Sequence, residues 1–190
     1  MNYIIRLLLA IVLLSNSLVS VAEVKVNEKV KYYTVAGNSA TALRSSLNQR
    51  SPIKTKAGTF DGYTRWYVEW RFNWRESESS CAITRVTTQV DVTFTLPKWH
   101  GTTSNQVLEN RWNNYYNSLV SHENGHKAFA INAAKKIERV LTELKPYDSC
   151  SELEKQANQL GHQILKDYIK QEKRYDVDTN HGLTQGAKFP

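Results

Sequence analysis

An apolar stripe with helical spacing runs through the middle of the sequence and defines its largest element. Its members recur between residues 112 and 144 at steps of mostly three or four, which places them on one face of an α-helix. They are Trp112, Tyr115, Leu119, His122, His126, Phe129, Ala133, Ile137, Val140, Leu141 and Leu144. Lys145 and Pro146 then end the pattern. We predict a long helix from about residue 105, with this stripe turned inward.

Two segments before this helix alternate between apolar and polar residues, which is typical of half-buried strands. The first is 65–75, "RWYVEWRFNWR", in which the aromatic residues and Val68 share one side. The second is 81–96, and Pro97 is expected to end it. The polar turn "ESESS" joins them, so we predict an antiparallel hairpin whose apolar side covers the core.

The remaining segments complete one α+β domain over residues 23–190, a length that suits a single core. A short strand is followed by the turn Gly37-Asn38-Ser39 and by a helix over 40–48, with Ser39 as its N-cap. A second helix is predicted over about 151–173, and the tail "YDVDTNHGLTQGAKFP" lacks periodicity and is predicted to be coil. The expected fold is a small antiparallel sheet packed on the long helix, with a second, C-terminal helix beside it.

Residues 1–22 have the pattern of a secretory signal peptide. Arg6 supplies the positive region, an apolar run follows, and Ser20-Val21-Ala22 forms a small-x-small cleavage site. An uncleaved N-terminal anchor is the alternative. We expect cleavage after Ala22, a periplasmic or extracellular location, and no stable membrane span in the cleaved chain.

The two cysteines of the chain, Cys81 and Cys150, are predicted to form a disulfide. Their even number in an exported protein favours pairing, because the compartments outside the cytoplasm are oxidising. Neither cysteine has the CxxC neighbour that structural zinc sites use, so a cysteine-based zinc site is not expected.

The sequence is basic, with 25 lysines and arginines against 18 acidic residues and a net charge of +7. This excess suggests affinity for anionic envelope polymers. Lysines scattered over solvated helix faces explain the same number equally well. We expect no nucleic-acid partner.

The segment "SHENGH", residues 121–126, places an HExxH pattern on the inward face of the long helix. Residues four apart on a helix lie one above the other, so His122 and His126 can direct imidazole nitrogens at one zinc ion. Glu123 then lies close enough to exchange a proton with a water molecule at the metal. Gly125 gives room for another segment to approach the site, or marks only a local irregularity of the helix.

A catalytic zinc site normally has three protein ligands, and the third is not in this helix. The extended pattern HExxHxxGxxH fails, because Phe129 and Asn132 occupy the required glycine and histidine positions. We predict His181, in the tail, as the third ligand. Asp176 and Asp178 are alternative ligands or orient a histidine. Weaker alternatives are Glu152 and Glu154.

One more tail residue is a catalytic candidate. The phenol of Tyr175 can stabilise an oxyanion opposite the zinc, or it can pack against the long helix.

The stretches "CAITRVTTQVDVTFTLPKW", "SHENGH" and "YDVDTNHGLTQGA", with the signal peptide and the lone downstream Cys150, resemble the DUF922 family of predicted secreted bacterial zinc proteases. The resemblance spans nearly the whole cleaved chain. It implies a zincin-like metalloprotease in which His122 and His126 bind zinc and Glu123 is catalytic. His181 falls in the second family motif. The resemblance also implies a bacterial protein.

The predicted function is therefore a secreted or periplasmic zinc-dependent metalloprotease acting on proteins or peptides. Two alternatives belong to other classes. A non-catalytic envelope-binding module would keep the metal as a structural element and would need a fourth protein ligand. A zinc amidase would act on the peptides of the cell wall.

Overall fold

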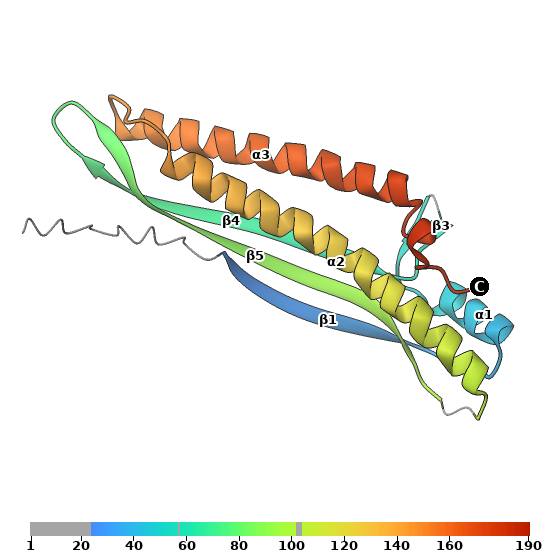
Figure 1. The fold of residues 1–190 in the computed structure, drawn as a ribbon. Coiled ribbons are helices and arrows are strands. Elements are labelled where there is room, and N and C mark those ends of the chain that lie inside the picture. The colour runs from blue at the N-terminus through green and yellow to red at the C-terminus, as the bar shows by residue number, and fades with distance from the viewer. Residues whose placement is uncertain (1–23, 57, 102–103) are drawn as a thin grey trace, which may run out of the picture.

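The computed structural model of the protein describes residues 24–56, 58–101 and 104–190 (Figure 1). Its elements are β1 (Lys25–Val35), α1 (Ala40–Arg50), β2 (Lys54–Thr55), β3 (Gly58–Thr59), β4 (Tyr63–Glu76), β5 (Cys81–Trp99), α2 (Gln106–Thr142), α3 (Cys150–Thr179) and the 3₁₀ turn η1 (Leu183–Gln185). The predicted signal peptide, residues 1–22, lies outside the described residues.

A three-stranded sheet in the order β1-β5-β4 forms one layer, and β2 and β3 make a separate small hairpin. β4 and β5 pair antiparallel, as the alternating segments predict. β1 pairs with β5 in the parallel sense. The prediction of a purely antiparallel sheet was therefore wrong, because α1 and the small hairpin carry the chain away between β1 and β4 before it returns.

The alternation in β4 matches the burial of its side chains. Val68 is buried and Trp66 and Trp70 are half-buried, whereas Tyr67 and Glu69 between them are exposed. A bulge between Asn73 and Trp74 shifts the register near the far end of the strand, and Trp74 is exposed there. The apolar side of the hairpin thus covers the core as predicted.

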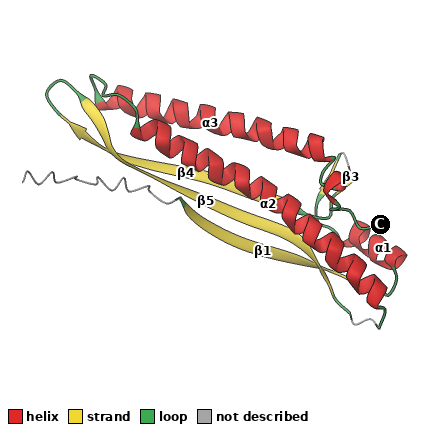
Figure 2. Ribbon diagram, viewed as in Figure 1, coloured by secondary structure: helices red, strands yellow, loops and turns green. Residues whose placement is uncertain are grey.

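Helices α2 and α3 lie side by side on one face of this sheet (Figure 2). The inward stripe of α2 is confirmed, because Trp112, Leu119 and Ile137 are buried in the core cluster that the strands share. With 37 residues, α2 is about 55 Å long and gives the molecule its elongated shape. None of the described helices is both long enough and apolar enough to cross a membrane.

β5 continues through Pro97 to Trp99, although the proline was expected to end it. β4 starts opposite Thr95, so beyond that residue β1 is the one described strand that pairs with β5. A proline on a strand with one free side removes no ladder hydrogen bond there, which explains why the strand continues.

α3 also continues further than predicted, to Thr179, so the first part of the tail is helix and not coil. Asn180 ends the helix in the left-handed conformation, with its N–H bonded to the carbonyls of Asp176 and Val177. The final turns lack apolar periodicity because their inward side chains are polar. These added turns bring Tyr175 and Asp176 onto a helix that packs along α2.

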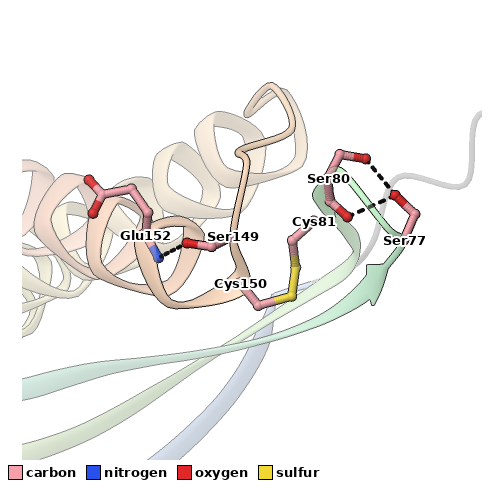
Figure 3. The surroundings of a disulfide bond; sticks show 6 residues. All are labelled: Ser77, Ser80, Cys81, Ser149, Cys150 and Glu152. Carbon is pink, nitrogen blue, oxygen red and sulfur yellow. Dashed lines mark hydrogen bonds between the residues drawn. A yellow bond between two sulfur atoms is a disulfide. The ribbon is translucent and has the colours of Figure 1, made fainter.

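The predicted disulfide between Cys81 and Cys150 is confirmed, and it joins the first residue of β5 to the first residue of α3 (Figure 3). Both ends lie beside short hydrogen-bonded motifs. Ser77 donates its hydroxyl to the carbonyl of Ser80, and the N-cap Ser149 accepts the N–H of Glu152. The crosslink therefore ties α3 to the sheet at one end of the molecule.

Replacing both cysteines by serine is expected to lower the free energy of unfolding by about 4 kcal/mol, because the disulfide closes a loop of 69 residues in the unfolded chain. Urea unfolding followed by circular dichroism measures this change. An unchanged midpoint would contradict the prediction. Adding reductant to the unsubstituted protein should reproduce the loss, whereas it should not affect the double variant.

Candidate metal centre

A cleft of about 1720 Å³ opens between α2, α3 and β4. The HENGH segment of α2 forms part of its wall, and the last turns of α3 lie opposite. His122, Glu123 and His126 are 4%, 3% and 8% exposed. The prediction that these residues face inward is confirmed.

Three donor atoms meet in this cleft and fit a zinc ion. The Nε2 atoms of His122 and His126 are 3.3 Å apart, and Oδ1 of Asp176 lies 3.4 Å from the first and 3.2 Å from the second. In a tetrahedral site with zinc–nitrogen bonds of about 2.0–2.1 Å, two ligand atoms are about 3.3–3.4 Å apart. The three distances therefore describe one face of such a tetrahedron.

The other ring nitrogens of the two histidines are held by partners that the sequence analysis missed. Nδ1 of His122 lies 2.8 Å from Oε1 of Gln185, and Nδ1 of His126 lies 3.1 Å from Oε1 of Glu172. The indole of Trp66 donates to the same Glu172 oxygen at 2.7 Å. Such contacts orient metal-binding histidines in proteins, because they fix the ring and point Nε2 at the ion.

The local electrostatics favour a cation between these residues. Burial opposes a charge on His126, yet hydrogen bonds to Asp176 and Glu172 outweigh burial and raise the pKa of His126 to about 10. Burial likewise opposes ionisation of Asp176, but the two histidines hold its pKa well below the usual range of a carboxyl group. Asp176 and Glu172 stabilise the positive charge of protonated His126. For the same reason, these two carboxylates favour a divalent metal ion at this place.

Glu123 is held on the floor of the cleft. The hydroxyl of Thr64 donates to its Oε2 at 2.6 Å, and a Cβ on Gly62 would lie only 2.6 Å from its Oε1. Burial raises the pKa of Glu123, and the hydrogen bond from Thr64 partly counteracts it. A fixed carboxyl group with a raised pKa is suited to taking up and returning a proton.

The predicted third ligand, His181, lies beside this cluster and not within it. Its side chain is 47% exposed, and its Nδ1 is 3.8 Å from Oδ2 of Asp176. Asp176, named as an alternative ligand, supplies the donor atom instead. Asp178 pairs with Arg174 on the exposed side of α3, and Glu152 and Glu154 lie near the disulfide end of the same helix.

The family model for DUF922, described as a bacterial protein of unknown function, matches residues 30–182. The chain belongs to the DUF922 family. The match includes the HENGH segment, Asp176 and His181, and it confirms the family that the motifs indicate. No curated protein and no solved structure matches the sequence.

Tyr175 of this DUF922 protein packs against α2, as one of its two predicted roles requires. Its ring stacks on His122 at 5.1 Å, and its hydroxyl donates to the carbonyl of His122 at 3.3 Å or to Oε1 of Gln185 at 3.2 Å. Gly125 allows this approach, because a Cβ there would lie 2.6 Å from the Cζ atom of Tyr175. The role of this phenol in stabilising an oxyanion stays a prediction.

In this DUF922 protein, Glu172→Gln is expected to weaken zinc binding by about 10- to 100-fold, because the amide no longer fixes His126 as a carboxylate does. Competition against a chromogenic chelator measures the affinity. Asp167→Asn, an exposed carboxylate on the same helix, is the matched control and should leave the affinity unchanged. Equal affinity in the two variants would show that Glu172 does not orient the site.

Proposed function

We propose that the protein is a zinc-dependent metallopeptidase. The observation that carries this proposal is the triangle of donor atoms from His122, His126 and Asp176, beside the buried carboxyl of Glu123. Catalytic zinc sites have three protein ligands and keep one position for water or substrate, whereas structural sites have four. Among the described residues, His122, His126 and Asp176 form the group whose nitrogen and oxygen atoms lie close enough together to bind one metal ion.

In this proposal the two histidines and Asp176 hold the ion, with Gln185 and Glu172 fixing the imidazole rings. Zinc at such a site supplies a Lewis acid that polarises a carbonyl group and lowers the pKa of water to about 7. The chain's own contribution is a rigid frame, because α2 and α3 carry the ligands and the disulfide ties α3 to the sheet.

Glu123 acts as general base and then as general acid. It takes a proton from the attacking water and returns it to the leaving amine, which is the proton path that peptide hydrolysis requires. Thr64 holds the carboxyl on the cleft floor through its hydroxyl, and burial raises the pKa of Glu123 toward the range useful for both steps.

A peptide substrate would lie along the edge of β4. This strand is at the edge of the sheet, and its inward residues Thr64, Trp66 and Val68 line the cleft. An extended peptide can add to such an edge through main-chain hydrogen bonds, which would carry its carbonyl groups past Glu123.

The test is to measure zinc content and peptide-bond cleavage together in the purified exported protein. Substrates are an unfolded protein and, separately, peptides released from cell walls, and mass spectrometry identifies new α-amino ends. Zinc-dependent cleavage of unfolded protein supports the peptidase. Cleavage of wall peptides alone supports the amidase alternative.

A structural zinc site is the second candidate, and the position of His181 favours it. Its imidazole lies 3.8 Å from Oδ2 of Asp176, and in a closed site it would turn to become the fourth donor. One bound zinc without any new α-amino end in either substrate would support this closed site and overturn the peptidase proposal.

A further inference from the structure

The face of the sheet opposite α2 and α3 carries a concentration of positive charge. We call the outer face the outward side chains of β1 from Lys25 to Lys31, of β5 from Arg85 to Thr95, and of β4 from Tyr63 to Asn73. It holds six basic residues and two acidic ones: Lys25, Lys29, Lys31, Arg65, Arg71 and Arg85 against Glu69 and Asp91. No described helix covers this part of the sheet (Figure 2). The outer face therefore has a net charge of +4 out of +7 for the whole sequence.

The basic residues of the outer face lack the acidic partners that three basic residues of α3 have. On α3, Lys155, Lys170 and Arg174 each pair with an acidic residue three or four positions away. None of the six cations on the outer face forms an ion pair with a described carboxylate. Asp91 instead accepts hydrogen bonds from the neutral side chains of Asn27 and Gln89. Lys25 interacts electrostatically with Asp91, and the remaining positive charge of the outer face is available for an anionic partner.

The cations lie in rows that suit an extended partner. Lys29 and Arg65 flank Thr93 in one row, and Lys31 lies beside Thr95 in the next. Neighbouring strands are about 4.8 Å apart, and outward residues on one strand are about 6.7 Å apart. The backbones of these three residues thus lie about 7 to 12 Å from one another on one face of the sheet.

Two exposed tyrosines alternate with Arg65 along β4. Tyr63 is 47% exposed and Tyr67 is 59% exposed, although both are large residues on a strand. An exposed aromatic ring offers an apolar surface with a polar tip, on which a sugar ring can stack while its hydroxyls bond to neighbouring groups. Thr93 and Thr95 supply such hydroxyl groups between the strands.

We propose that the outer face binds a linear anionic polysaccharide, a chain of sugar rings that carries carboxylates. The rows of lysine and arginine would pair with the acid groups, and Tyr63 and Tyr67 would pack against the rings. A lipid surface fits less well, because large exposed aliphatic side chains such as Val107, Val177 and Leu183 lie elsewhere on the described chain. This proposal does not depend on the metal site or on any peptidase activity.

The experiment measures binding of the purified exported protein to a fluorescent alginate oligomer, which is a polymer of uronic acids, with a neutral dextran oligomer as reference. The test variant is Lys29→Gln with Lys31→Gln and Arg65→Gln. The matched control is Lys155→Gln with Lys166→Gln and Lys170→Gln on α3, which lowers the net charge equally. We expect the test variant to bind about tenfold more weakly and the control to stay within about twofold of the unsubstituted protein.

A second pair of variants tests the tyrosines. Tyr67→Ala should weaken alginate binding several-fold, whereas Tyr32→Ala should not, because Tyr32 is similarly exposed at 55% but points to the other face of the sheet. All these side chains are exposed, so thermal unfolding should stay unchanged.

Three results would overturn the proposal. The first is equal weakening in the two triple variants, which would mean that only total charge matters. The second is equally tight binding of single-stranded DNA, because the surface would then select any polyanion. The third is no saturable binding of alginate above the dextran reference.

Discussion

Asp176→Asn is expected to lower the affinity for zinc by about a hundredfold or more, because it weakens one of only three proposed protein ligands. Asparagine keeps the shape of the side chain but loses the negative charge. Among the described residues, the structure brings Oδ1 of Asp176 within reach of both Nε2 atoms, so this charge directly faces the proposed ion.

His181→Asn is the matched variant, and we expect it to change zinc affinity by only a few-fold. His181 lies beside Asp176, and its imidazole is not among the three donor atoms that meet. Competition titrations on the two variants and the unsubstituted protein give the three affinities. The opposite order, with zinc lost in His181→Asn and retained in Asp176→Asn, would restore His181 as the third ligand.

Periodicity predicted the long elements of this fold because each has one face in the core. The stripe on α2 and the alternation in β4 both place apolar side chains on one side, and both match the observed burial. Ser39 was also predicted as the cap of α1, where its hydroxyl accepts the N–H of Ala42. These features depend on neighbours in the sequence, so the sequence alone indicates them.

The parallel position of β1 depends on contacts between distant segments and has no local signal. The predicted end of α3, at about residue 173, was too early because the apolar pattern again gives no signal there. Its final turns face the polar cleft and not the core, so the apolar pattern stops before the helix does. Once that helix was predicted to end early, Asp176 was placed in a coil and ranked below His181.

A usable signal was nevertheless present on α3. Glu172 and Asp176 are four residues apart, as are His122 and His126 on α2. Two carboxylates with helical spacing can face two histidines with helical spacing, and both carboxylates contact this pair. Thr64 and Gln185 could not be found in this way, because each reaches the site only through the folding of a distant segment.

Glu123→Gln is expected to lower kcat by about 10²- to 10⁴-fold while zinc stays bound, because the amide cannot take a proton from water. This prediction depends on the proposed peptidase activity. The substitution should leave the fold intact. Glutamine still offers Thr64 a carbonyl oxygen, and burial already disfavours the charge of the native carboxylate.

The measurement compares kcat and zinc content for Glu123→Gln and for Glu109→Gln, an exposed glutamate in the first turn of the same helix. The control should match the unsubstituted protein in both quantities. Full activity in Glu123→Gln would remove Glu123 from the mechanism. Loss of both zinc and activity would instead indicate that Glu123 holds the metal site together. Retained zinc with lost activity separates proton transfer from metal binding, because Glu123 then moves the proton while His122, His126 and Asp176 hold the ion.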